Sequence, residues 1–570
     1  MVVGWLSFAF RTQEQSPLSP QITGGDALAW ALESIGLDTL YAVPGGQLDH
    51  FFDAIQRMGS NRIRLLRPRH EQAAAYMAFG HARSTGTVGA YCVVPGPGVL
   101  NTLAALSTAW ATSSPVLCIS GQVPTHAIGS GAGYLHEIPD QLGILARLTR
   151  FAERIESPEA AGRCIHKAMA AMFSGRLRPV SVEMPMDVMA ESSVVSDIDQ
   201  FVRPRVKAPD AGQIEEAAKQ LASARRPLIY VGSGALAASQ EISQLSALLA
   251  APVGAFRSGR GVLDSRNPLS LVFPAARRAW AEADVVLAIG TRLKYPQMYW
   301  GLDESLKVIR VDLDPEEFDR HQSPEIAIEA DARLTALALA EALTRHDMQI
   351  NKNWNARGSD IRRGVEGEIS QHLSVQLPWL SAIRQAVPEE GILVDEITQM
   401  GYCSWYAYPV YGPRSLVTAG YQGTLGYGFA TALGVAVANP DRPVVSINGD
   451  GGYLYTANEW ATAMEYGIPL VAVVFNDNRY ANVYRQQKEW FDERFIAADL
   501  VNPDFVAHAR SFGVLAERAT TPNELQKLIR EAIERREPRL IEVSLPADMP
   551  TPWRFIIEPP VRGDAAERNL

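Results

Sequence analysis

Short apolar runs alternate with amphipathic stretches along most of this chain. Between residues 20 and 195, amphipathic stretches such as GGDALAWALESIG and EQAAAYMAFGHARSTG predict helices. The runs between them predict buried strands: TLYAVPG, GAYCVVPGPG, PVLCISGQ and PVSVEMP. Apolar strands separated by helices are typical of a parallel sheet with both faces covered. The pattern predicts an α/β domain over 20–195.

The same alternation occurs twice more. Residues 212–345 contain the apolar runs RPLIYVGSG, ADVVLAIG and LKVIRVDLD, and residues 374–550 contain GILVDE, RPVVSINGDGG, PLVAVVFNDN and PRLIEVSLP. Polar stretches near 192–211 and 346–370 predict linkers. We therefore expect three doubly wound parallel-sheet domains in series, a number that suits 570 residues at roughly 150 residues per domain.

Composition narrows the classes of function. The net charge is −10, which gives no electrostatic basis for binding nucleic acid or an anionic membrane. No apolar run reaches the ~20 residues that cross a bilayer. The first 15 residues have neither a basic leader nor a cleavage site, so they predict an extension and not a signal peptide. The four scattered cysteines are expected as core thiols in the cytoplasm.

Acidic residues follow two apolar runs of the third block. Gly449, Asp450 and Gly451 end one run, and Asp477 ends the next, 27 residues later. Because parallel strands present their carboxyl ends at one edge of a sheet, Asp450 and Asp477 can meet there. Glycines let backbone amides approach a diphosphate, and oxygen ligands suit Mg²⁺, or Mn²⁺ equally well. Two ordinary turns are the plainer reading, but the spacing favours a metal–diphosphate site.

This arrangement resembles the thiamine-diphosphate-dependent enzymes, whose motif is GDG, a spacer of under thirty residues and then NN. The resemblance makes Asp450 the first ligand of Mg²⁺ and places Asp477 where the family usually has its second Asn. The carbonyl of Arg479 then completes the shell. Further implied cofactor contacts are Gly449, Gly451, Gly452 and Tyr480.

The first block carries a second resemblance. RPRHEQAAAYMAFGHAR places Glu71 where the family has the Glu that hydrogen-bonds the pyrimidine ring of the cofactor and promotes its deprotonating tautomer. PGPGVLN then places Pro97, Gly98 and Asn101 in the loop beside that ring. Pro44 and Gly45 are further implied contacts, and Gln47 in PGGQLDH is a candidate substrate contact. The resemblance names the first block the pyrimidine-binding domain, the second the central domain and the third the diphosphate-binding domain.

A third resemblance lies just before the GDG motif. GYQGTLGYGFATALG matches the loop that bends the cofactor, with Leu425 as the apolar wedge and the carbonyl of Gly423 as the acceptor for the pyrimidine amino group. Gln399 matches a position near the thiazolium ring. Within the family the chain resembles acetolactate synthase over about residues 20–550. The resemblance implies a homodimer or homotetramer in which Glu71 of one subunit meets Asp450 and Asp477 of another.

Three places depart from acetolactate synthase. Its Phe-Gln-Glu segment is Leu135-His136-Glu137 here, and its Arg-Gln-Trp segment is Arg485-Gln486-Gln487. The central block has only a weak G-x-G-x-x-A pattern at Gly232, Gly234 and Ala237, so we do not expect FAD. Because an imidazole exchanges protons near neutral pH, His136 is a candidate proton carrier and His70 a second one.

These observations predict a thiamine-diphosphate- and Mg²⁺-dependent enzyme that makes or breaks a C–C bond next to a carbonyl. The substrate class is a 2-oxo acid, an aldehyde or a diketone, and decarboxylase, carboligase and lyase all stay open. Acetolactate synthase proper is the main alternative. A catalytically silent scaffold is a third hypothesis, which would have to explain why Glu71 is kept.

Overall fold

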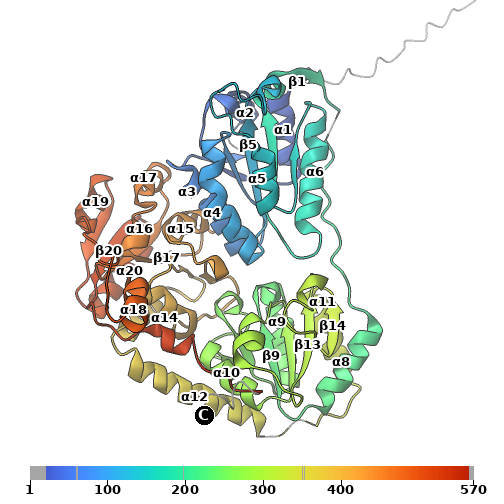
Figure 1. The fold of residues 1–570 in the computed structure, drawn as a ribbon, viewed down its shortest axis with the longest axis vertical. Coiled ribbons are helices and arrows are strands. Elements are labelled where there is room, and N and C mark those ends of the chain that lie inside the picture. Colours follow the sequence, from blue (N-terminus) through green and yellow to red (C-terminus); the bar gives the residue numbers. More distant parts are fainter. Residues whose placement is uncertain (1–20, 60–61, 197, 350, 352, 564–570) are drawn as a thin grey trace, which may run out of the picture.

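The computed structural model describes residues 21–59, 62–196, 198–349, 351 and 353–563, which form three α/β units in series (Figure 1). The predicted extension at residues 1–15 lies outside these residues. Each unit is built on a six-stranded parallel sheet. Each sheet lies within one of the three predicted blocks, whose boundaries stay predictions. Among the described residues, no helix is both long and apolar enough to cross a membrane.

The first unit has the strand order β3-β2-β4-β5-β7-β6. Its strands are β2 (Thr39–Ala42), β3 (Arg64–Leu66), β4 (Gly89–Val93), β5 (Val116–Gln122), β6 (Ala152–Arg154) and β7 (Val180–Pro185). Its helices are α1 (Gly24–Ser34), α2 (Asp49–Met58), α3 (Glu71–Thr85), α4 (Pro97–Thr112), α5 (Gln141–Leu148), α6 (Ala160–Phe173) and α7 (Met186–Ala190). A separate antiparallel pair, β1 (Gln21–Thr23) and β8 (Ser192–Val194), closes the unit beside α1.

The middle unit has the order β11-β10-β9-β12-β13-β14, with the strand order reversing between β9 and β12. Its strands are β9 (Pro227–Val231), β10 (Val253–Ala255), β11 (Ser270–Leu271), β12 (Val285–Ile289), β13 (Lys307–Asp312) and β14 (Ile326–Glu329). Its helices are α8 (Ala211–Ser223), α9 (Ser239–Leu248), α10 (Phe273–Glu282) and α11 (Ala332–Leu343).

The third unit has the order β16-β15-β17-β18-β20-β19. Its strands are β15 (Ile392–Val394), β16 (Leu416–Val417), β17 (Val444–Gly449), β18 (Leu470–Asn476), β19 (Leu515–Arg518) and β20 (Arg539–Ser544). Its helices are α13 (Leu377–Ala386), α14 (Gln399–Ala407), α15 (Gly428–Ala438), α16 (Asp450–Tyr453), α17 (Trp460–Tyr466), α18 (Ala481–Trp490), α19 (Phe505–Ser511) and α20 (Pro522–Arg535).

The segment predicted as a second linker is largely helical. Residues Trp354–His372 form α12, a long helix that runs along the middle and third units (Figure 1). Its buried residues Trp354, Ile361, Val365 and Ile369 recur at helical spacing, which explains why a stretch that is polar on average still folds. The cysteine prediction is confirmed: Cys92, Cys118, Cys164 and Cys403 are all buried and unpaired.

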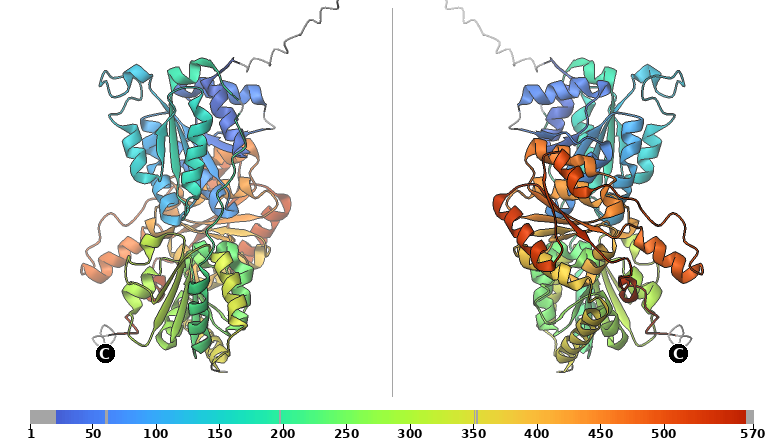
Figure 2. Two further views of the ribbon diagram at one scale, coloured as in Figure 1. Left: turned by 90° about the vertical axis from the view of Figure 1, so that its right-hand side faces the viewer. Right: turned by 90° about the vertical axis from the view of Figure 1, so that its left-hand side faces the viewer.

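Helices α3 and α15 join the first and third units. They cross so closely that a Cβ added at Gly80 would lie 2.2 Å from the Thr431 carbonyl oxygen, and one at Gly434 would lie 2.0 Å from that of Met77. Only glycine fits such a crossing. The two helices share one buried apolar cluster with both sheets, so the first and third units pack directly on each other (Figure 2).

Candidate active site

The carboxyl edge of the third sheet brings Asp450 and Asp477 together, as the sequence predicted. β17 and β18 are hydrogen-bonded neighbours with Gly449 opposite Phe475, Asp450 begins α16, and Asp477 follows β18. Burial raises the pKa of Asp450. Burial and the charge of Asp450 together raise the pKa of Asp477 to about 7. Two neighbouring buried carboxylates repel each other when both are ionised, and a bound cation between them removes that repulsion.

Three asparagines complete this edge, and the sequence analysis assigned a role to none of them. The Asn502 side-chain amide donates to Oδ2 of Asp450 at 2.7 Å and to Oδ1 of both Asn476 and Asn478 at 3.2 Å. Three oxygens therefore converge on one positively polarised group. Among the described residues no three His, Cys, Asp or Glu side chains gather as a metal site, so the donors here are carboxylate and amide oxygens. That donor set fits Mg²⁺.

Arg479 and Tyr480 take different places at this edge. The Arg479 side chain turns away, with Nη2 3.5 Å from Asp499 and the guanidinium over the Tyr484 ring, so only its carbonyl remains as a candidate ligand. The Tyr480 ring lies against Gly451, where an added Cβ would come within 2.5 Å of Cε1. Gly449 and Gly452 are less crowded, since added Cβ atoms would lie 2.9 Å from Thr398 Oγ1 and 3.1 Å from Glu396 Cδ.

The predicted cofactor-bending loop precedes α15. Gly423 adopts the left-handed conformation with φ 57°, and Leu425 is partly buried. Gln399 begins α14, five residues beyond the end of β15, and is buried. Beside it lies Glu396, a fully buried carboxyl that accepts from the Gly428 amide at 2.9 Å, and burial raises its pKa to about 8. Gln399 and Gly449 therefore lie at the carboxyl ends of neighbouring strands.

The first unit contributes a second group of predicted residues. Glu71 is the first residue of α3, and the Asn101 side-chain amide donates to its Oε2 at 3.0 Å. His70 caps the helix by accepting from the Gln72 amide, and its Nδ1 lies 3.9 Å from Glu71 Oε2. The predicted proximity of Glu71 and Asn101 is therefore present, whereas the structure gives His70 a capping contact. Pro97 is the first residue of α4.

His136 lies on a loop that packs against the start of α4. Its φ is 69°, and its Nδ1 lies 3.2 Å from Oε1 of Gln47, whose Nε2 donates to the Leu135 carbonyl. A Cβ at Gly96 would lie 2.4 Å from the His136 carbonyl oxygen. Gly45, which follows Pro44 after β2, packs as tightly on Val94.

Glu137 holds the shape of the His136 loop, a role that the sequence analysis missed. Its carboxylate accepts from the backbone amides of Gly131, Gly133 and Tyr134 and from the Ser130 hydroxyl. These bonds lower the pKa of Glu137, so the carboxylate stays ionised. Three backbone amides bound to one side chain fix the loop that presents His136.

Within one chain, the two groups of predicted site residues are not bonded directly to each other. Across the described residues, no hydrogen bond or ion pair joins the predicted site residues of the first unit to those of the third.

A separate cavity of about 1150 Å³ lies where the three units meet, at the reversal between β9 and β12. Gly232 and Gly234 line it, and a Cβ at Gly232 would lie 2.4 Å from the Gly290 carbonyl oxygen, so packing explains this glycine. Its lining holds more cations than acids: the cations are Arg83, Arg150, Arg176, Arg203, Arg205, Lys207, Arg257, Arg292, Lys294 and Arg414, and the acids are Asp312, Asp314, Glu329 and Asp331. Such a lining favours an anion. The prediction that the central domain holds no FAD stays a prediction.

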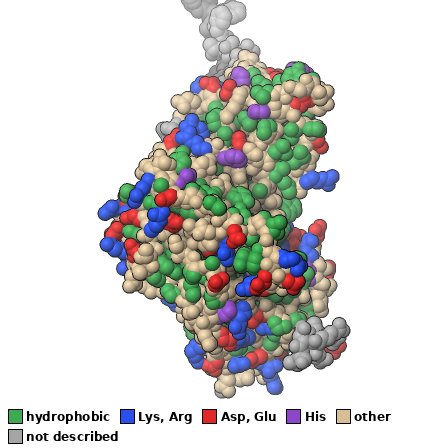
Figure 3. All heavy atoms as spheres, turned by 60° about the vertical axis from the view of Figure 1, so that its left-hand side comes forward, with side chains coloured by type: hydrophobic (Ala, Val, Ile, Leu, Met, Phe, Trp, Pro, Cys, Tyr) green, Lys and Arg blue, Asp and Glu red, His purple; other side chains and the backbone are tan. Residues whose placement is uncertain are grey.

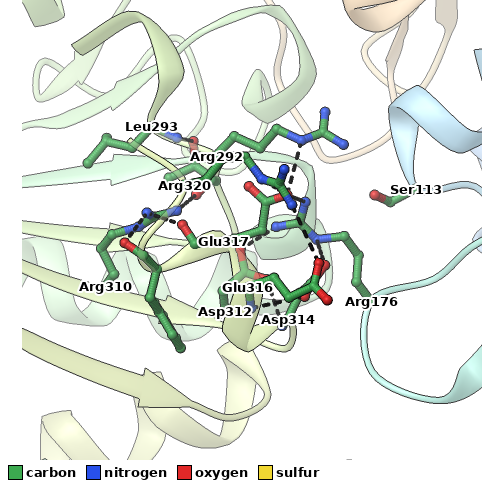
Figure 4. Close-up of polar contacts among 12 residues, drawn as sticks. Ser113, Arg176, Arg292, Leu293, Arg310, Asp312, Asp314, Glu316, Glu317 and Arg320 are labelled. Atoms are coloured by element: carbon green, nitrogen blue, oxygen red, sulfur yellow. Dashed lines mark hydrogen bonds and ion pairs between the residues drawn. The ribbon is translucent and has the colours of Figure 1, made fainter. Parts of the chain in front are cut away.

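One wall of this cavity is an ion cluster between the first and middle units. Arg176, from a loop of the first unit, points toward the acidic end of β13 (Figure 4). Its guanidinium lies 2.6 Å from Asp312 Oδ2 and 3.1 Å from Glu317 Oε1. The cluster fixes how the two units sit beside the cavity.

Comparison with known proteins covers all three units. Residues 22–144 match the model of the thiamine pyrophosphate enzyme N-terminal TPP binding domain, 214–339 the central domain, and 396–543 the C-terminal TPP binding domain. The chain is similar to a probable 2-ketoarginine decarboxylase from Pseudomonas aeruginosa, with 34% identity over 92% of this chain and 95% of that protein.

Acetolactate synthases are similar over the same extent. A probable large subunit from Methanocaldococcus jannaschii is 32% identical over 91% of each chain. The isozyme 1 large subunit from Escherichia coli is 28% identical over 93% of this chain and 95% of its own. With three matched domains, in order, over most of its length, the chain belongs to the thiamine-diphosphate-dependent enzymes related to acetolactate synthase, which decarboxylate or join carbonyl compounds.

Proposed function

We propose that two copies of this chain join the two half-sites into an active site that binds thiamine diphosphate through Mg²⁺ and cleaves or forms the C–C bond next to the carbonyl of a 2-oxo acid. The observation that carries the proposal is that each pair is held within its own unit, and that no hydrogen bond or ion pair of the described residues links Glu71 and Asn101 to Asp450 and Asp477. A symmetric dimer would bring the two halves together twice.

Exposed apolar side chains next to the third-unit half-site support a subunit interface. Tyr421 is 51% exposed beside the Leu425 loop, and Leu454 and Tyr455, just after α16, are 40% and 51% exposed. Figure 3 shows hydrophobic side chains exposed across one face of the molecule. A group of exposed large apolar side chains next to functional residues is typical of a surface that another chain covers. The proposal includes either a homodimer or a homotetramer.

Each residue has a role in that site. The bound cofactor supplies an electron sink for the bond that breaks or forms. Asp450 and Asp477 would hold the metal with carboxylate oxygens, and the carbonyl of Arg479 would be the third donor at the same edge. Glu71 carries a proton at its carboxyl, and Asn101 orients that carboxyl. His136 carries a second proton near the substrate, with Gln47 orienting the imidazole.

The positions where the chain departs from acetolactate synthase guide the choice of reaction and of substrates to test. Leu135 is 74% exposed beside His136, and Gln487 replaces the Trp of the synthase segment. These changes favour a decarboxylase or lyase, and the similar protein from P. aeruginosa makes 2-ketoarginine the first substrate to test. Acetolactate synthesis from pyruvate is the second candidate, favoured by the synthases that match over the same length. The four buried, unpaired thiols suit a reducing compartment, and we place the enzyme in the cytoplasm.

The test is a panel of 2-oxo acids, acyloins and diketones, each incubated with the protein, thiamine diphosphate and Mg²⁺ while CO₂, aldehyde and acyloin are measured. We expect at least one 2-oxo acid to release CO₂ only when both additions are present. A preparation that converts none of the panel would contradict the proposal. Acetolactate as the main product from pyruvate would favour the second candidate.

A further inference from the structure

The geometry points to Glu459 as a positioning residue that fixes Glu71 for proton transfer, an inference that rests on the role proposed for Glu71. Glu459 ends the short helix η8 (Ala457–Glu459) of the third unit and is fully buried. Glu71 begins α3 of the first unit. The contact between them is made through the backbone just before Glu71.

The Glu459 carboxylate binds two consecutive backbone amides of the other unit. The Arg69 amide donates to Oε1 at 3.1 Å and to Oε2 at 3.0 Å, and the His70 amide donates to Oε1 at 3.1 Å. His70 is the N-cap of α3, so the carboxylate fixes the residue from which that helix starts. Fixing the N-cap backbone fixes the Cα of Glu71, the next residue in the chain.

The carboxylate is itself held on its other side. The Thr462 hydroxyl donates to Oε2 at 2.5 Å, and the Asn458 amide donates to Oε1 at 3.2 Å. A fully buried carboxyl is tolerated only when it is hydrogen-bonded in this way, and it then holds its partners firmly. Burial raises the pKa of Glu459, and the hydrogen bonds from Thr462 and from the backbone amides of Arg69 and His70 act against that shift.

Nearby contacts are more exposed and so contribute less. Arg67 and Arg69 each lie 3.0 Å from Glu465, but the two arginines are 44% and 46% exposed and Glu465 is 32% exposed. Solvent-exposed ion pairs contribute little to stability. Glu459 is therefore the buried anchor of the segment, and Glu465 is a matched control acid on the same surface.

Glu459 also belongs to the segment that carries the metal edge. It follows Asp450 by nine residues, and α16 and η8 are consecutive elements. In the proposed dimer, Glu71 serves the cofactor that the partner subunit holds. One short segment therefore supplies a metal ligand to its own site and the anchor for the proton carrier of the other site.

The test uses Glu459→Gln, with Glu465→Gln as the control and Glu71→Gln as the reference. Glutamine keeps the size of the side chain, but its NH₂ group cannot accept from a backbone amide. The main readout is the rate at which the thiazolium C2 proton of bound thiamine diphosphate exchanges with D₂O, at saturating cofactor and Mg²⁺. Cofactor Kd and the unfolding midpoint are measured on the same samples.

We expect Glu459→Gln to slow this exchange by on the order of tenfold, a part of the roughly 10²–10⁴-fold that an oriented acid–base group contributes, while the cofactor Kd stays within about threefold of wild type. The control variant should exchange like wild type. A folded Glu459→Gln protein with wild-type exchange would overturn the inference. If that variant does not fold, Thr462→Val removes one donor to Oε2 and should slow exchange by a smaller factor, and wild-type exchange in it would overturn the inference equally.

The Glu71→Gln reference separates the two claims. Slow exchange in Glu71→Gln with normal exchange in the Glu459 variant refutes only the positioning role. Normal exchange in Glu71→Gln refutes the role proposed for Glu71 itself.

Discussion

Replacing Arg176 with alanine tests what holds the first and middle units together. The Arg176 side chain is 11% exposed, and its partners Asp312 and Glu317 are 5% and 2% exposed. The substitution removes the closest cation from two buried carboxylates. Removing one partner of a buried ion pair typically costs 3–5 kcal/mol, on the order of the whole margin of stability of a small domain.

The expected cost lies at the lower end of that range. Two other arginines stay next to Glu317 when Arg176 is replaced: Arg320 and Arg292, which lie 3.2 and 3.7 Å from it in the wild-type chain. We therefore expect a loss of about 3 kcal/mol in the free energy of unfolding at neutral pH. Lys167→Ala is the control, because Lys167 and its partner Glu153 are 51% and 33% exposed, and exposed pairs contribute less than about 1 kcal/mol.

The loss in the free energy of unfolding should become smaller as the pH falls. Burial raises the pKa of Asp312 in the folded protein even though Arg176 acts to lower it. A carboxyl group whose pKa is higher in the folded protein than in the unfolded chain does not destabilise the protein below its unfolded pKa of about 3.9. Above that pH it lowers the free energy of unfolding, and the loss grows as the pH rises toward the pKa of the folded state. Without Arg176 the folded pKa rises further, so the difference from wild type should narrow as pH falls toward 4.

The assay is urea unfolding of wild type and both variants between pH 7.5 and 4.5, read as the midpoint of the transition. A loss in Arg176→Ala no larger than in Lys167→Ala would refute the account of this interface. If the difference in stability between wild type and Arg176→Ala stays constant down to pH 4.5, the pH dependence attributed to Asp312 is refuted.

Three further predictions concern the site. Glu137→Ala should free the loop that presents His136 and lower kcat by on the order of tenfold with little change in cofactor Kd, whereas a changed Kd with normal kcat would contradict this role. Gly451→Ala should weaken binding of thiamine diphosphate, because the new methyl group meets the Tyr480 ring at 2.5 Å, and titration calorimetry with an unchanged Kd would count against it. The purified protein should show no flavin absorbance near 450 nm, and a yellow preparation that releases FAD on denaturation would refute that expectation.

The strands that the sequence predicted are the buried central ones. β5, β17 and β18 are buried almost throughout and are mostly apolar, so hydrophobicity identifies them. The edge strands β11 and β16 have only two residues each, and their sequences show no run long enough to predict. The helix α12 was missed because its average polarity concealed the helical spacing of its buried residues.

The site was predictable where the sheet topology dictated it. Asp450 and Asp477 follow adjacent parallel strands, and the topology brings such positions together. Asn502 lies 24 residues beyond Asn478, after helix α18 and an irregular segment whose path no local pattern encodes. Glu459 is a single acid in an amphipathic stretch, and its contact with residues 69 and 70 depends on how two domains pack.

The most direct test of the account mixes two inactive variants, Glu71→Gln and Asp450→Ala, and measures C2-proton exchange of thiamine diphosphate with Mg²⁺. Each variant alone should exchange far more slowly than wild type. In a mixed dimer, one of the two sites combines an intact Glu71 with an intact Asp450. Random re-association of equal amounts should make half of the dimers mixed, each with one intact site out of two. The mixture should therefore recover about a quarter of wild-type exchange. No recovery in verified mixed dimers would contradict the proposal that each active site is built from two subunits.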